Sequence, residues 1–135
     1  MNWKLIFQLS AFGLIMAFAT ISLIPDKVEP AFWLVIFIFC SWVIAKVCTG
    51  KYFLYGFFVS LVNCVWITSV HLIFHTSYVA NHQATADSIN SIPWVLNNHP
   101  RISMAIIGTF IGAVSGLVLG LFAFIASKIV KKNPA

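Results

Sequence analysis

Four long apolar stretches dominate this sequence, at residues 5–24, 31–47, 52–78 and 102–130. A helix that crosses a membrane needs about 20 mainly apolar residues, within a range of about 17 to 25. The composition agrees, since 61% of the residues are hydrophobic and only 8% are charged, against about 25% charged in an average soluble domain. The sequence therefore predicts an all-α integral membrane protein with a single four-span domain covering residues 1–135.

Short connections set the expected arrangement of these spans. All five prolines lie outside the apolar stretches or in a first turn, so each span is expected to be one unbroken helix. The connections at 25–30 and 48–51 are short enough to make neighbouring helices antiparallel. The one long connection, 79–101, contains "NHQATADSIN", which is expected to form a turn or two of helix. The prediction is a bundle of four antiparallel transmembrane helices.

Lysine and arginine are distributed unevenly around the spans. If both termini lie on one side, that side holds six of the eight basic residues, namely Lys4, Lys46, Lys51, Lys128, Lys131 and Lys132. Basic residues near span ends favour the cytoplasmic side. Both termini are therefore predicted to be cytoplasmic, in a multi-pass protein of the inner (plasma) membrane. The net charge of +5 is thus explained by the orientation of the spans. The expected partner is the lipid bilayer, and no nucleic-acid partner is expected.

Small residues mark one face of the last span. Glycine is a poor helix former in water, yet it recurs at every fourth position, at Gly108, Gly112, Gly116 and Gly120. In membranes such residues let two helix backbones approach closely. The first span has a similar face, with Ser10, Gly13, Ala17 and Thr20. The glycine face is expected to pack on the first span, or on the last span of a second chain in a homo-oligomer or larger membrane complex.

Polar side chains form a stripe on the third span. Within a limited arc of the helix lie Ser60, Asn63, Thr68, His71 and His75, together with Gly56, Cys64 and Tyr78. Asn63 is near the middle of the span, where an unpaired amide costs on the order of several kcal/mol. The stripe is therefore expected to face protein or a water-containing cavity.

Two histidines in this stripe are candidate metal ligands. His71 and His75 are one helical turn apart in "HLIFH", a spacing at which both imidazoles can bind one zinc or copper ion. His82, His99 and Asp87 lie in or beside the following connection. The alternative is that the histidines hydrogen-bond to other helices, and the glutamate that follows the first histidine in zinc metalloproteases is missing here. A haem site is disfavoured because nearly all the histidines lie on the third span or its exit, and no cofactor-binding residue is predicted.

Catalytic patterns are lacking in the spans. Cys64 and His71 share a face but are about two turns apart, too far for a nucleophile and base at about 2.6–3.2 Å. In length and number of spans the chain is similar to the small multidrug transporters, which are dimers of four-span chains. Their proton exchange depends on a glutamate in the first span, where this chain has only Gln8. No catalytic residue is predicted, and the chain is not expected to be an enzyme.

Three functional interpretations follow from these patterns. The first is a non-enzymatic accessory or scaffold subunit that packs through its glycine-rich helix faces. The second is a conduit or small-ligand transporter with a polar cavity lined by the third span. The third is a metal-binding protein at the outer face of the membrane.

Overall fold

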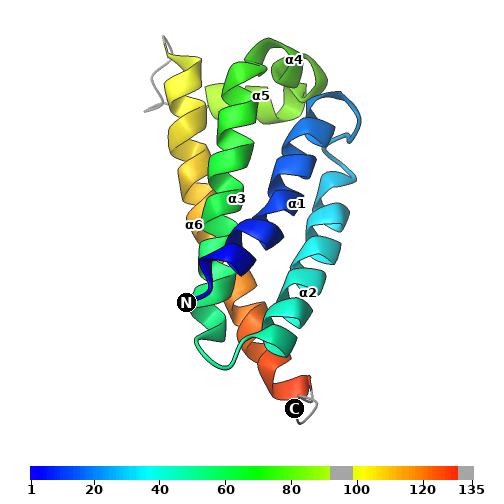
Figure 1. Cartoon of the computed structure of the whole chain (residues 1–135). Helices are drawn as coiled ribbons and strands as arrows, with labels where there is room; N and C mark the ends of the chain where they lie inside the picture. The colour runs from blue at the N-terminus through cyan, green and yellow to red at the C-terminus, as the bar shows by residue number, and fades with distance from the viewer. Residues whose placement is uncertain (92–98, 131–135) are drawn as a thin grey trace.

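The computed structural model describes residues 1–91 and 99–130, which form six helices (Figure 1). These are α1 (Trp3–Ser22), α2 (Glu29–Val47), α3 (Tyr52–Ile73), α4 (His75–Asn81), α5 (Gln83–Asn90) and α6 (Pro100–Ile129). There is no strand within these residues. Four of the helices, α1, α2, α3 and α6, are long and apolar enough to cross a membrane. The prediction of an all-helical protein with four such helices is confirmed, while Lys131 and Lys132 lie outside the described residues.

The third apolar stretch is not one continuous helix. α3 ends at Ile73, and Phe74, with φ −99° and ψ 31°, separates it from α4. The expected span 52–78 is therefore wrong at its end, and His71 and His75 belong to different helices. The break turns α4 toward the end of α1, where the Asn81 amide donates a 3.0 Å hydrogen bond to the Ile21 carbonyl oxygen. Contact with α1 thus gives a physical reason for the change of direction, which no proline marks.

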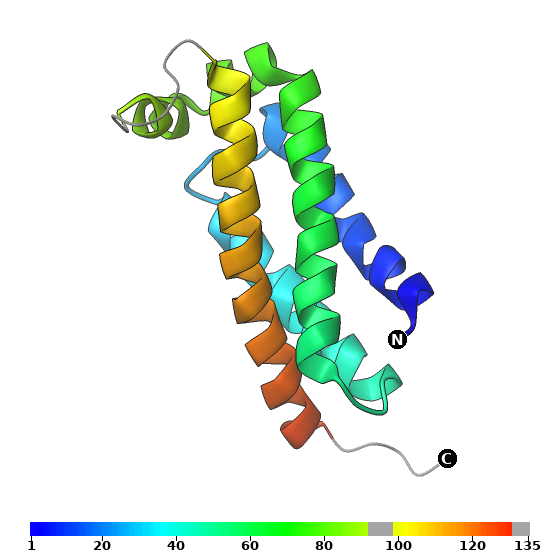
Figure 2. The ribbon, with the colours of Figure 1, turned by 90° about the vertical axis from the view of Figure 1, so that its left-hand side faces the viewer.

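α3 is the central helix of the bundle. It lies beside α6 along its length (Figures 1 and 2) and packs against α1 on another side. α4 and α5 lie together at one end of the bundle (Figure 2). We refer to this as the α4–α5 end.

The glycine face of α6 packs on α3 of the same chain, and not on α1, the first span expected from the sequence. A Cβ at Gly120 would lie 2.8 Å from the ring of Phe53 in α3, and one at Gly116 would lie 2.9 Å from the ring of Phe57. Thr68 and Cys64 of α3 likewise fill the space beside Gly108 and Gly112. Bulky α3 side chains and glycines on α6 are complementary in shape, so each glycine accommodates an α3 residue.

The small face of α1 packs on a different side of α3. The space beside Gly13 is filled by the Asn63 side chain. Ser10 Oγ accepts a 3.2 Å hydrogen bond from Trp66 Nε1 of α3. α3 is therefore placed between two small-residue faces, which explains how it comes to make the main helix contacts of the bundle.

A cluster of buried apolar residues occupies one half of the bundle. It lies where α1 and α3 begin and where α2 and α6 end, and it consists of Leu5, Ile6, Leu9, Cys40, Ile44, Cys48, Tyr55, Val59, Leu119 and Ala123. All the buried residues of α2, namely Cys40, Ser41, Ile44 and Ala45, lie in its second half. Of the four long helices α2 has the smallest buried share, 22%. The first half of α2 leaves a space in the other half of the bundle.

Large apolar side chains cover the outside of the bundle. Phe110 of α6 is 70% exposed, and similar residues are exposed on α1, α2 and α3. An apolar surface of this extent is unfavourable in water and suits contact with lipid chains. The molecule therefore has the properties of a small membrane protein.

Candidate ligand-binding cavity

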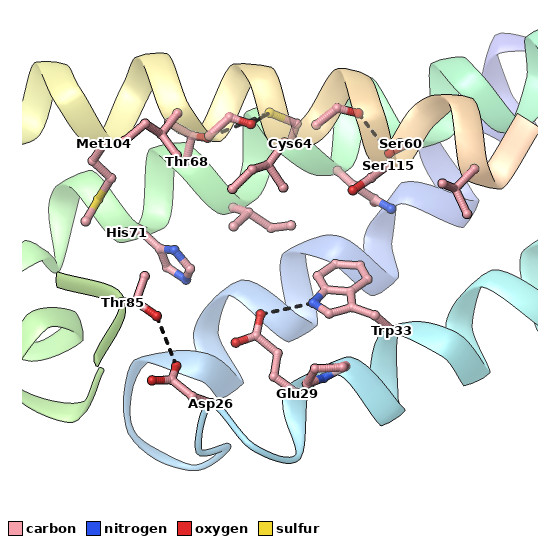
Figure 3. Close-up of a pocket in the computed structure, with 18 of the residues that line it drawn as sticks. Asp26, Glu29, Trp33, Ser60, Cys64, Thr68, His71, Thr85, Met104 and Ser115 are labelled. Carbon is pink, nitrogen blue, oxygen red and sulfur yellow. Dashed lines mark hydrogen bonds between the residues drawn. The ribbon is translucent and has the colours of Figure 1, made fainter. Parts of the chain in front are cut away.

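A cavity of about 900 Å³ lies between α2, α3 and α6. Figure 3 shows Ser60, Cys64 and Thr68 on one wall, with Asp26, Glu29 and Trp33 opposite. α4 and α5 contribute Tyr78, Thr85 and Ser88 at one end. Apolar lining comes from α2, α3 and α6, through Leu34, Phe37, Ile67, Met104, Ile107, Ile111, Val118 and Phe122. The cavity is thus a mainly apolar space with polar groups along one helix and at one end.

The polar stripe predicted on the third span forms much of one wall. Ser60, Asn63, Thr68 and His71 all line the cavity, and Cys64 lies among them. His75, which begins α4, is not among the described lining residues. The break at Phe74 explains this difference, because the helical register that relates His75 to the stripe is interrupted there.

Two polar groups of the α3 wall already have partners on α6. Ser60 Oγ donates a 3.3 Å hydrogen bond to the Gly112 carbonyl oxygen. Cys64 Sγ donates to the Gly108 carbonyl oxygen at 3.1 Å. The absent glycine side chains allow these contacts with the α6 backbone. This part of the wall therefore offers little unused hydrogen-bonding capacity.

Asn63 is the exception on this wall. Its side chain is buried, with 3% exposure, and lies against Gly13 of α1. Neither its Nδ2 nor its Oδ1 makes a hydrogen bond to any described residue. Leaving an amide unpaired in an apolar environment costs roughly 2–7 kcal/mol. Asn63 is consequently the group of the wall with the most to gain from a polar ligand atom or a water molecule.

His71 is held by a hydrogen bond to α1. Thr20 Oγ1 is 2.8 Å from the Met16 carbonyl oxygen and 2.9 Å from His71 Nε2. Since a hydroxyl has one proton and a carbonyl oxygen only accepts, Thr20 donates to Met16 and accepts from His71 Nε2–H. Nδ1 is then the nitrogen left for other partners. The joint metal site of His71 and His75 stays a prediction.

A row of three stacked rings leads from His71 to the α4–α5 end. The ring centroids of His71 and Tyr78 are 4.0 Å apart, and those of Tyr78 and His82 are 4.4 Å apart. Burial and the nearby Glu29 and Asp26 carboxylates raise the pKa of Tyr78 to about 12. The phenol therefore stays protonated at neutral pH and is available as a hydrogen-bond donor.

Two carboxylates lie at the same end of the cavity. Trp33 Nε1 donates a 3.0 Å hydrogen bond to Glu29 Oε1, and Thr85 Oγ1 is 3.5 Å from Asp26 Oδ1. Asp26 and Glu29 fall in the short connection 25–30, for which the sequence predicts no function. Their spacing of three residues around the start of α2 was the available signal, since Glu29 belongs to the first turn of that helix. Only the fold shows that they border the cavity.

No protein-family model, curated protein or solved structure matches this chain. The chemistry of the cavity is therefore the basis for proposing a function.

Proposed function

We propose that this membrane protein binds a small amphiphilic molecule in the cavity between α2, α3 and α6, as a non-enzymatic conduit or ligand-binding protein. The observation that carries the proposal is the cavity of about 900 Å³ whose wall includes the polar face of α3. Ligand pockets typically measure about 300–1,000 Å³ and combine an apolar lining with a few polar groups. Both properties are present here.

The lining indicates the chemistry of the ligand. Ile107, Ile111 and Phe122 offer apolar contacts, whereas Asn63 offers an unpaired amide that both donates and accepts hydrogen bonds. A ligand with an apolar body and one uncharged polar group, such as a long-chain alcohol, satisfies both. Asn63 Nδ2 and Oδ1 are buried against α1, so the side chain would have to rotate toward the cavity for the ligand's polar group to supply the hydrogen bonds that it lacks.

An accessory or scaffold role has less support than the sequence alone gave it. That interpretation depended on a glycine face free to receive another helix. α3 fills the space beside Gly108, Gly112, Gly116 and Gly120 within the chain. Assembly through this face would require α3 to leave it, so ligand binding is the better proposal.

The orientation follows from the basic residues and belongs to the same proposal. With both termini in the cytoplasm and the protein in the inner membrane, the α4–α5 end faces outward. Asp26, Glu29 and Thr85 then border the cavity at its outer end. The ligand would enter from the outer half of the membrane or from the outer solution.

Photolabelling tests the proposal with a diazirine-bearing fatty alcohol as the probe. In protein reconstituted into lipid nanodiscs, we expect labelling of α6 peptides to include Met104, which lines the cavity. Ser115→Trp fills the cavity and should reduce this labelling to background. Val114→Trp is the matched control, because Val114 is exposed and is not among the described lining residues. The two variants should have similar melting temperatures.

Comparison of Ser115→Trp with Val114→Trp decides whether the probe binds in the cavity. Equal labelling of Met104 in both variants would show that the probe reaches this helix from lipid and would overturn the proposal. Loss of labelling in Ser115→Trp alone, with both proteins folded, would support it. A further supporting result is a small molecule that co-purifies with the unmodified protein in native mass spectrometry and is absent from Ser115→Trp.

A further inference from the structure

His82 is buried beside two partly exposed carboxylates at the α4–α5 end of the bundle. Its side chain is 1% exposed, and it follows directly after α4. His82 Nε2 is 3.2 Å from Asp26 Oδ1 and 4.0 Å from Glu29 Oε2. The three donor atoms all lie within 4.8 Å of one another. One nitrogen and two oxygen ligands therefore converge on a single point.

The other ring nitrogen of His82 fixes the direction of its lone pair. Nδ1 lies 3.3 Å from the Tyr78 carbonyl oxygen. A carbonyl oxygen only accepts, so Nδ1 carries the proton, and in the neutral ring Nε2 presents its lone pair to the carboxylates. Lone pair and carboxylate repel each other unless a cation lies between them. A cation between His82 Nε2 and the two carboxylates would remove this repulsion.

The spacing of the donors favours a metal ion over a proton. Nε2 makes no hydrogen bond to any described residue, although Asp26 Oδ1 is only 3.2 Å away. Tetrahedral zinc with ligands at about 2.0–2.2 Å places neighbouring donor atoms about 3.4 Å apart. The distances of 3.2 and 4.0 Å lie on either side of that value. A proton on His82 Nε2 is shared with one carboxylate oxygen, whereas a metal ion binds the nitrogen and both oxygens.

Each donor residue is also oriented by a second residue. Trp33 Nε1 donates to Glu29 Oε1, Thr85 Oγ1 is 3.5 Å from Asp26 Oδ1, and the Tyr78 carbonyl oxygen faces His82 Nδ1. Metal-binding histidines almost always donate their other N–H to a carbonyl or carboxylate, and carboxylate ligands are hydrogen-bonded in turn. The cluster has the outer partners that bound metals require.

We infer that Asp26, Glu29 and His82 form a binding site for a divalent metal ion of the zinc class, with a fourth position left for water. The site differs from the pair His71 and His75 expected from the sequence. It does not depend on the proposed ligand, because Asp26 and Glu29 lie at the end of the cavity and not along the α3 wall, and His82 is not among the described lining residues. It joins the α1–α2 connection, the start of α2 and the α4–α5 junction.

Metal titration of the purified protein tests the inference. After chelator treatment and its removal, Zn²⁺ is titrated by calorimetry, and Co²⁺ is added separately for visible absorption. We expect one Zn²⁺ per chain and the intense visible bands of tetrahedral Co²⁺. His82→Ala should abolish both signals, and Asp26→Asn, which keeps the shape of the side chain, serves if His82→Ala does not fold. His75→Ala is the control and should bind normally.

A substitution at a residue that orients a ligand without binding the metal itself gives a more specific test of the site. Trp33→Phe keeps an aromatic ring but removes the hydrogen bond to Glu29, and should weaken Zn²⁺ binding about tenfold. Ser115→Trp should still bind one Zn²⁺ per chain, which separates this site from the proposed ligand site. The inference is overturned if the unmodified protein binds no stoichiometric Zn²⁺, or if folded His82→Ala binds it normally. Loss in His75→Ala with normal binding in His82→Ala would assign the metal to the other pair.

Discussion

Gly56 of α3 is in direct contact with the backbone of Leu119 in α6. A Cβ added at position 56 would lie 2.6 Å from the Leu119 carbonyl oxygen and 2.9 Å from the Gly120 Cα. Backbone atoms cannot avoid such a clash by changing a rotamer. The two helices can therefore keep this distance only with glycine at position 56.

Gly56→Ala is expected to destabilise the protein. Alanine improves helix propensity by about 1 kcal/mol, but forcing a group into a packed contact typically costs about 1–3 kcal/mol or more. We expect the clash to dominate and to lower the melting temperature in detergent. Gly50→Ala is the control, since no described atom lies within 4 Å of a Cβ there. Equal melting temperatures for the two variants would contradict the close contact of α3 and α6.

The effect of Gly13→Ala on the unfolding free energy should depend on the residue at position 63. The added methyl would meet the Asn63 side chain, with Cγ 2.6 Å away. This partner is a side chain and not backbone, so its removal relieves the clash. We expect Gly13→Ala to destabilise the chain in the presence of Asn63 and to be nearly neutral with Asn63→Ala. A double-mutant cycle on unfolding free energies measures this coupling, and simple additivity of the two changes would argue against it.

Thr20→Val tests the link between α1 and α3. The substitution keeps the side-chain shape but removes the hydroxyl that lies 2.9 Å from His71 Nε2. The unfolding free energy should fall by about 1–3 kcal/mol, because a buried imidazole N–H loses its acceptor. Thr20→Ser retains the hydroxyl, so the unfolding free energy should fall less. In ¹⁵N-histidine NMR spectra the unmodified protein should show His71 protonated at Nε2, and protonation at Nδ1 would refute the assignment.

Reporter fusions test the orientation. The basic residues predict that fluorescent protein at either terminus is fluorescent in the cytoplasm. A cysteine placed at Asp87, in a chain whose native cysteines are replaced, should react with a membrane-impermeant maleimide added from outside. Alkaline phosphatase that is active when fused to the C-terminus would reverse the proposed orientation.

The sequence predicted the helices well because span length and the absence of charge are properties of each segment alone. Four helices of the expected type occur, with ends shifted by a few residues. The glycine positions indicated a close helix contact but not its partner, because complementarity depends on the bulky residues of another helix. Phe53 and Phe57 of α3 carried no signal of that role.

The acid and histidine cluster was beyond sequence reasoning for a similar reason. Asp26 and His82 are far apart in the chain and meet only because α4 turns toward α1. That turn occurs at Phe74, without proline or glycine. Its cause is tertiary contact, which no local pattern contains. The polar face of α3 was foreseen from periodicity, whereas the space in front of it depends on where α2 lies.

The one-sided burial of α2 has a consequence for how binding events influence one another. Its second half is fixed in the core through Cys40 and Ile44, while its first half borders the cavity through Glu29 and Trp33. A small tilt about the fixed half changes the cavity volume and the distance from Glu29 to His82 together. If both proposed sites bind, occupancy of either is therefore expected to alter the affinity of the other, and thermodynamic linkage requires the effect to be equal in both directions.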